Sequence, residues 1–491
     1  MTLDLALSLL PFFLFVGGAF LIYLICNFGR LSNKVEAILT SIILLLAIFA
    51  LFVQGSILMG AAITRPWNQV SLIVPEFNLS ASLIGIFVVS AACIVGIFIC
   101  IYSGEYLSRD PRSLLYYPLI LLLFAGLLGM FYVGDLFSLF ILAEVTTITA
   151  SGLTAFRFDQ AAAVRAGYQY LVMSSLGTLV MMLGIYFIYR ETALLDIAAL
   201  ADIQNSAITI GGACFGLGFC IKAGVAPVHA WVPKVYANAP SAISGLFASV
   251  TSKAMLFILP GVVLKLNITP EQIGIFLVAF SIASMLVGVI RMLTQQNLRR
   301  LLAFSAITHT GYLMFILGIY FLYGSPEALV AALFTFLSIA MMKAMGFLCV
   351  GVYEYILQVK TIQSIKGAFQ RMPFTAISFS IALAGLAGIP LFAGFIGKWL
   401  IYSAAVSTRA PLVLAGFAVF LLCSILALVS YLSVLIRQFQ PAEEQMLEVL
   451  SPLSLWMKLP VGVLGFSVVL LGILPSPVLD VVLRLAGRMY F

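Results

Sequence analysis

The stretch KAGVAPVHAWVPKVYANAPSAISGLFASVTSK, residues 222–253, decides how the rest of this chain is organised. It follows an apolar run, contains three prolines (Pro227, Pro233 and Pro240), and ends inside a second apolar run that contains Lys253. A proline inside a helix removes a backbone donor and clashes with the preceding turn, so this pattern predicts a broken helix beside a second helix. In a membrane, such a break persists only where protein or water satisfies the freed carbonyls.

The composition places the whole chain in a membrane. Of its 491 residues, 63% are hydrophobic and 9% are charged, which excludes a water-soluble domain of this size. Apolar runs long enough to cross a bilayer recur about fourteen times, so we expect an all-α polytopic membrane protein. The expected spans are 4–26, 35–56, 81–102, 113–131, 134–156, 165–189, 206–226, 241–263, 270–292, 301–323, 328–352, 374–402, 411–436 and 459–481.

The distribution of basic residues predicts the orientation of these spans. If the spans are numbered in order, 15 of the 25 lysines and arginines fall on one face of the membrane and six on the other. Positive-inside bias then places the richer face in the cytoplasm and both termini outside. The four that remain lie inside predicted spans: Lys222, Lys253, Lys343 and Lys398.

Charged side chains inside the membrane are the candidate functional residues. A lysine at the centre of a span costs roughly 2.5–3.5 kcal/mol on the insertion scale, so four of them indicate an ion path. Glu144 is the one carboxylate predicted near the middle of the bilayer, and a nearby ammonium such as Lys222 would tune its proton affinity. The alternatives are a structural hydrogen bond for Glu144 and snorkelling of Lys222 and Lys253 to the interface.

Both histidines belong to candidate polar segments. His309 falls well inside the tenth span, where a neutral imidazole can pass a proton between its ring nitrogens or serve as a core hydrogen-bonding group. His229 lies in the proline-rich stretch and fits either a polar relay or a packing role. The seven cysteines fall in apolar runs without a CxxC pair, so the sequence predicts no metal site and no cofactor.

A second break suggests an internal repeat. Pro390 interrupts the twelfth span with Lys398 after it, five spans beyond the first break. An odd offset reverses the direction through the membrane, which predicts two inverted repeats of five helices, spans 4–8 and 9–13, with breaks in helices 7 and 12. We therefore divide the chain into scaffold helices (1–112), a first half-channel (113–263), a second half-channel (264–436), and a surface loop with the last helix (437–491).

Five ordered motifs within spans 4 to 13 resemble one family. They are similar to the antiporter-like subunits shared by respiratory complex I, Mrp-type cation/proton antiporters and membrane-bound hydrogenases. The motifs are DLFSLFILAE (135–144), IKAGVAPVHAWVPKVYANAPSAISGLFASVTSK (221–253), NLRRLLAFSAITHTGY (297–312), KAMGFLCVG (343–351) and LAGIPLFAGFIGK (386–398).

The resemblance implies a role for each buried charge. Glu144 and Lys222 would form the ion pair of the first half-channel, Lys253 would be the next proton carrier, and Lys398 the terminal carrier of the second half-channel. Lys343 and His309 would lie on or near a central polar axis. One departure matters: many relatives have a histidine four residues before the eleventh-span lysine, where this chain has Ile339.

The sequence therefore predicts a subunit that translocates protons, alone or exchanged for sodium, within a larger complex in a prokaryotic inner membrane or an equivalent energy-coupling membrane. Its partners would be other integral membrane subunits, with a peripheral redox arm if the complex is redox-driven or without one if it is a cation/proton antiporter, and the subunit itself would carry out no redox chemistry. The scattered basic residues do not indicate nucleic-acid binding. Two alternatives stay open: a stand-alone secondary transporter of a small solute, and a purely structural membrane subunit.

Overall fold

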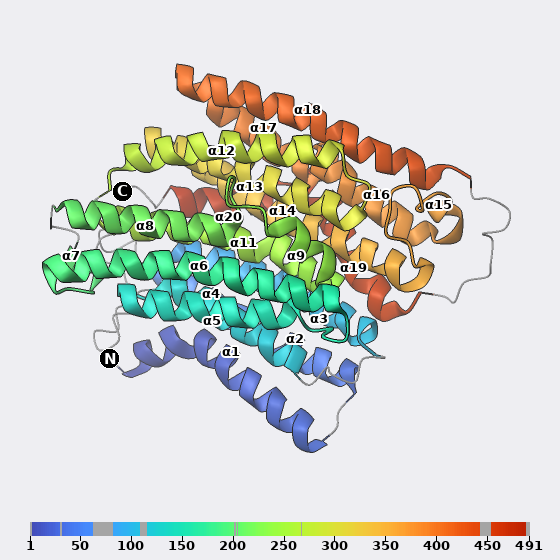
Figure 1. The fold of residues 1–491 in the computed structure, drawn as a ribbon, viewed down its shortest axis with the longest axis horizontal. Helices are drawn as coiled ribbons and strands as arrows, with labels where there is room; N and C mark the ends of the chain where they lie inside the picture. Colours follow the sequence, from blue (N-terminus) through green and yellow to red (C-terminus); the bar gives the residue numbers. More distant parts are fainter. Residues whose placement is uncertain are drawn as a thin grey trace.

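The fold is built from helices that run side by side in one bundle (Figure 1). The computed structural model describes residues 2–29, 32–61, 82–108, 115–200, 203, 205–266, 268–441 and 453–487. In these ranges the only β-type pairings are two isolated bridges, Asp135 with Asp196 and Asn297 with Thr361. Most of the predicted surface loop, residues 442–452, lies outside the described ranges.

The helices follow the predicted apolar runs closely. In order they are α1 (Thr2–Gly29), α2 (Asn33–Ala61), α3 (Leu83–Tyr106), α4 (Tyr116–Tyr132), α5 (Leu136–Thr154), α6 (Ala161–Thr192), α7 (Ile197–Leu200), α8 (Ser206–Ala223), α9 (Val232–Asn238), α10 (Ser241–Leu246), α11 (Ser252–Val263), α12 (Pro270–Leu293), α13 (Leu298–Tyr323), α14 (Pro326–Val352), α15 (Ala368–Arg371), α16 (Pro373–Ala387), α17 (Ala393–Thr408), α18 (Pro411–Phe439), α19 (Leu455–Ile473) and α20 (Ser476–Ala486). Two π-helical turns, η3 (Phe247–Thr251) and η5 (Tyr353–Leu357), and a short 3₁₀ turn, η4 (Leu264–Leu266), complete the set.

Twelve of the described helical segments are long and apolar enough to cross a membrane. Two shorter apolar helices are also present: Tyr116–Tyr132 matches the fourth predicted span, and Pro373–Ala387 matches the first half of the twelfth. The all-α membrane fold is therefore confirmed. The number fourteen, the location of the termini and the division into repeats stay predictions.

The core of the bundle consists of α10–η3–α11, α13 and α14. The apolar windows of these segments are 94–100% buried, whereas those of α1, α2 and α18 are only about one-third buried. The peripheral helices α1 and α18 lie at opposite edges of the bundle in Figure 1. Their exposed apolar side chains match the lipid environment that the composition requires.

The first predicted break is present between α8 and α9. Helix α8 ends at Ala223, and Gly224 follows with φ 71°, a left-handed conformation that favours glycine. The indole Nε1 of Trp231 donates to the Ile221 carbonyl at 3.0 Å, so protein satisfies a carbonyl at the helix end. The chain then forms α9 and turns at Pro240 into α10.

The second break separates α16 from α17 in the same way. Helix α16 ends at Ala387 and is followed by Gly388 with φ 83°. Here the Nζ of Lys398, on α17, donates to the Ala387 carbonyl at 2.7 Å. Each break therefore has a lysine on an adjoining helix and a left-handed glycine: Lys222 before Gly224 and Lys398 after Gly388.

Candidate functional site

The Glu144 carboxylate lies between α5 and α6. Asp135 begins α5 as its N-cap, accepting a hydrogen bond from the Ser138 amide at 2.7 Å, and this places Glu144 midway along the helix. Its Oε1 accepts from Ser175 Oγ at 3.0 Å and its Oε2 from Thr178 Oγ1 at 2.6 Å. Two hydroxyls of α6 thus solvate a carboxylate that the membrane would otherwise leave unsatisfied.

The Lys222 amine is held by the residues next to this carboxylate. Its Nζ donates to the Ala143 carbonyl at 2.9 Å, to Thr147 Oγ1 at 2.5 Å and to Ser174 Oγ at 2.9 Å. The side chain is buried, which excludes snorkelling to an interface in this structure. Lys222 and Glu144 interact electrostatically, but no hydrogen bond or ion pair joins them in the described part of the chain.

Lys253 occupies the helix beyond the first break, two residues after the π-helical turn η3. Such turns are frequent at functional sites because they interrupt the regular hydrogen-bond ladder. Its side chain is 1% exposed, and no hydrogen bond to its amine is found among the described residues. Lys253 interacts electrostatically with Lys343, which places these two cations near one another in the core.

Lys343 is hydrogen-bonded to a chain of two hydroxyl groups at the centre of the bundle. This fully buried lysine on α14 donates to the Leu302 carbonyl at 3.2 Å and to Ser305 Oγ, both on α13. Ser305 Oγ in turn shares a hydrogen bond with the Tyr431 hydroxyl on α18. An amine and two hydroxyls therefore form a continuous hydrogen-bonded line across three helices.

His309 lies one turn along α13 from Ser305. Its Nδ1 is 2.7 Å from the Ser305 carbonyl oxygen, and because a carbonyl only accepts, Nδ1 donates and carries the proton. In the neutral ring, Nε2 is then the acceptor. The imidazole packs edge-on against Tyr312, with ring centroids 5.1 Å apart, and interacts electrostatically with Lys343, Lys398 and Lys253.

Lys398 reaches the same group of residues from α17. Besides its bond to the Ala387 carbonyl, its Nζ lies 5.8 Å from the centre of the Tyr312 ring. The Tyr312 hydroxyl accepts a hydrogen bond from Ser424 on α18 at 3.2 Å. The structure thus gathers Lys343, His309 and Lys398 around α13.

His229 lies apart from this group. It belongs to the connection between α8 and α9 and lines a separate cavity of about 280 Å³ with Lys234, Arg291 and Arg300. Burial and the nearby Arg291 charge lower the pKa of its imidazole, so the ring favours the neutral form there. The structure does not bring His229 together with the buried lysines.

Sequence reasoning missed the hydroxyl partners of the buried charges. Serine, threonine and tyrosine are too common in apolar helices for any one of them to be recognised from sequence alone. The signal that could have helped is a position one helical turn from a charged residue, as for Thr147, three residues after Glu144. The missed residues are Thr147, Ser174, Ser175, Thr178, Ser305 and Tyr431.

Known proteins share sequence similarity with this chain. A family model described as the transmembrane region of NADH:quinone oxidoreductase and Mrp antiporters matches residues 133–424. The chain is 30% identical over 381 residues to an NADH-quinone oxidoreductase subunit of Halorhodospira halophila, covering 74% of this chain and 76% of that protein. It is 26% identical over 416 residues to a Na(+)/H(+) antiporter subunit of Alkalihalophilus pseudofirmus, covering 84% and 83%.

The fold is also shared with a solved structure. A chain of the membrane-bound sulfane sulfur reductase, an archaeal respiratory membrane complex, superposes with a TM-score of 0.81 at 23% identity, covering 99% of this chain and 98% of that one. The family match spans α5, both breaks and the four lysines Lys222, Lys253, Lys343 and Lys398. The chain therefore belongs to the NADH:quinone oxidoreductase/Mrp antiporter transmembrane family.

Proposed function

We propose that this protein is the ion-translocating subunit of a multisubunit membrane complex and moves protons along its buried lysines. The observation that carries the proposal is the contact of Lys343 with Ser305, and of Ser305 with Tyr431, in the buried centre of the bundle. A hydroxyl both donates and accepts, so it can take a proton from an ammonium and release another to its neighbour. A purely structural lysine would not require such a continuous line of proton donors and acceptors.

The first half-channel would control the proton affinity of the next carrier. Glu144 accepts from Ser175 and Lys222 donates to Ser174, two consecutive residues of α6, so rotation of either side chain would close or open their ion pair. When Lys222 is neutralised by Glu144, a proton on Lys253 feels less repulsion; when the pair is open, the repulsion returns. The pair would thus drive protons from Lys253 toward Lys343.

The second half-channel would receive and release the proton. His309 presents Nε2 as an acceptor while Nδ1 stays bound to the Ser305 carbonyl. This ring can substitute for the histidine that many relatives have at the position of Ile339. Lys398, at the second break, would be the terminal carrier, with its amine exchanging the Ala387 carbonyl for the exit path.

Partners must supply the energy. Moving one charge against the membrane potential takes about 2.3 kcal/mol per 100 mV, so the driver would be a redox reaction or an opposing ion gradient. The relatives named above belong to respiratory and antiporter systems, which supports other membrane subunits, with or without a redox arm, as partners. Either source of energy is compatible with transport of protons alone and with exchange of protons for sodium.

The test is proton flux through the native complex in proteoliposomes, measured with an internal pH dye. We expect Lys398→Ala to slow proton uptake by about 100-fold or more, the scale of losing a positioned proton-transfer group. Lys458→Ala is the matched control, because Lys458 lies in the first turn of α19, outside the proposed path, and it should pump at the normal rate. A Lys398→Ala complex that assembles and pumps normally would contradict the proposal.

A further inference from the structure

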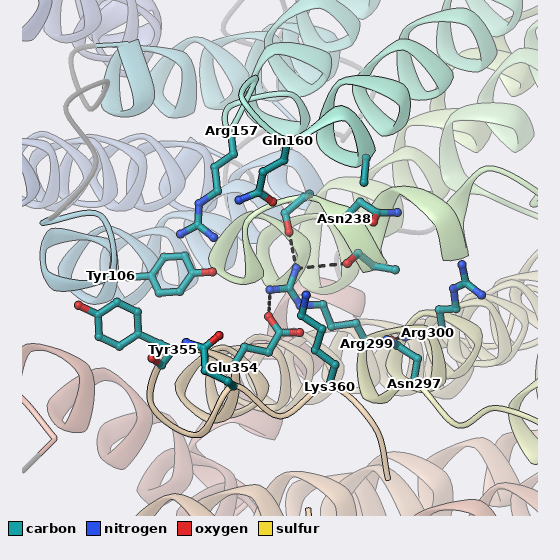
Figure 2. A pocket seen from close by; sticks show the side chains of 14 residues that line it. Tyr106, Arg157, Gln160, Asn238, Asn297, Arg299, Arg300, Glu354, Tyr355 and Lys360 are labelled. Atoms are coloured by element: carbon teal, nitrogen blue, oxygen red, sulfur yellow. Dashed lines mark hydrogen bonds and ion pairs between the residues drawn. The ribbon is translucent and has the colours of Figure 1, made fainter. Parts of the chain in front are cut away.

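A second polar cavity lies away from the proposed proton path. It has a volume of about 580 Å³ and forms where the ends of α3, α9 and η5 meet the beginnings of α6 and α13 (Figure 2). None of the buried path lysines is among its lining residues. The polar side chains that line it are Tyr106, Arg157, Gln160, Asn238, Asn297, Arg299, Arg300, Glu354, Tyr355, Gln358 and Lys360.

Positive charge dominates this cavity. Among the described lining residues, Arg157, Arg299, Arg300 and Lys360 are cationic, and Glu354 is the one carboxylate. The basic residues come from segments far apart in sequence, which the fold brings to a single hollow (Figure 2). Like charges within one cavity repel each other, so a cluster of this kind is stabilised by a bound anion.

Arg299 forms an ion pair with the single carboxylate of the cavity and hydrogen bonds with the end of α9. Its side chain is 6% exposed; Nη2 donates to Glu354, and Nη1 donates to the Ala239 carbonyl at 2.5 Å and the Ala237 carbonyl at 3.4 Å. Its Nε is buried without a partner in the described part of the chain. Arg299 and Glu354 therefore neutralise each other, and the Nε donor of the guanidinium has no partner among the described residues.

The three other cations keep their charge. The Arg157 guanidinium stacks 4.8 Å from the centre of the Tyr106 ring, an arrangement that fixes its plane and leaves its N–H edge free to donate. Arg300 and Lys360 are exposed at the rim. No carboxylate other than Glu354 lines the described wall to balance them.

Two long helices add to the positive potential. Helix α13 begins at Leu298, with Asn297 and Arg300 in the wall, and helix α6 begins at Ala161, with Gln160 and Ala162 in the wall. The N-terminus of a helix carries a partial positive charge. Asn297 caps α13 by accepting from the Arg300 amide at 3.0 Å, and the Leu298 amide donates to the Lys360 carbonyl. The Gln160 side chain does not cap α6, so of its first three amides only that of Ala163 is bonded within the described part of the chain, to the Gln160 carbonyl.

We propose that this cavity binds the phosphate group of an anionic ligand, either an anionic phospholipid headgroup or a soluble phosphate ester. Planar guanidinium groups bind phosphate oxygens in pairs, and a phosphate carries enough charge to balance three cations better than one carboxylate would. The volume accommodates a phosphate with a small polar substituent such as glycerol. A bound phosphate would tie together α6, α13 and the segment after η5.

Titration calorimetry of the purified full chain in a nonionic detergent tests this site. The probes are sodium phosphate, glycerol 3-phosphate and dihexanoyl phosphatidylglycerol, each against sodium chloride at equal ionic strength. We expect saturable binding that Arg300→Gln/Lys360→Gln weakens by about tenfold or more, because charge-assisted hydrogen bonds are lost. The double variant Arg165→Gln/Arg291→Gln removes the same charge from exposed positions outside this cavity and should bind normally.

The probes separate the two sources of phosphate. If glycerol 3-phosphate binds, a soluble phosphate ester is a sufficient ligand. If only the lipid binds, the ligand is a phospholipid headgroup. Either result supports the site. The proposal is overturned if none of the probes binds saturably, or if the two double variants weaken binding equally. It is also overturned if a hexaglutamate peptide binds more tightly than every phosphate probe, because the occupant would then be an acidic protein segment.

Discussion

At the scale of single residues, the molecule solvates its membrane charges with hydroxyls. Glu144 is bound by Ser175 and Thr178, and Lys222 by Thr147 and Ser174. An uncompensated charge in the bilayer costs several kcal/mol, so these contacts explain how the charges persist. In the proposed function, the same hydroxyls would also pass protons.

Ser305 is the residue where this double role can be tested. We expect Ser305→Ala to lower the free energy of unfolding by about 1–3 kcal/mol, because the buried Lys343 amine and Tyr431 hydroxyl lose a shared partner. Proton flux should fall as well, because the hydrogen-bonded line is cut. Ser467→Ala is the control: its hydroxyl bonds only to its own helix on an exposed face. Normal flux in Ser305→Ala would remove Ser305 from the path.

A site residue can be predicted from the sequence when its type is rare in membrane-spanning segments. Lysines inside apolar runs are rare, so all four path lysines could be named from sequence, and the structure buries Lys222, Lys253 and Lys343. The burial of Arg299 could not be predicted in this way, because its partner Glu354 is 55 residues away in sequence. Only the packing of α13 against η5 reveals that pair.

At the scale of elements, the two breaks are the features that place the lysines. Both were predictable because proline and glycine interrupt apolar runs visibly. The register of the helix after each break could not be predicted, since it depends on left-handed glycines and on which side chain reaches the freed carbonyl. Trp231 does so at the first break and Lys398 at the second.

The glycine at the second break should be sensitive to substitution. Gly388 has φ 83°, so the alanine in Gly388→Ala would have to adopt a left-handed conformation, which costs about 1–2 kcal/mol. Its Cβ would lie 2.6 Å from Lys398 Cδ, so the lysine must leave the Ala387 carbonyl. Thermal unfolding and proton flux measure the two effects.

Gly216→Ala is the matched control for this substitution. Gly216 lies inside α8, has no left-handed φ, and nothing stands within 4 Å of the position its Cβ would take. Alanine there should leave flux unchanged and preserve or raise stability, because alanine favours a helix over glycine. If Gly388→Ala behaved like Gly216→Ala, the break would not position Lys398.

At the scale of the whole molecule, the most buried helices carry the path residues of the core. Lys253, His309 and Lys343 lie on α11, α13 and α14, whose apolar windows are almost fully buried, whereas α1, α2 and α18 expose apolar faces. Those faces suit lipid or other membrane subunits. The fold thus encloses these charged and polar side chains and exposes apolar side chains at its periphery.

The measurement that tests this account most directly is proton flux through the native complex carrying Lys343→Met, a substitution that keeps the size of the side chain and removes its charge. The account predicts an assembled complex whose proton uptake is about 100-fold slower or more, since the central carrier is gone. Lys458→Met supplies the control for a lysine outside the path. A Lys343→Met complex that assembles and pumps at the normal rate would contradict proton transfer along the buried lysines.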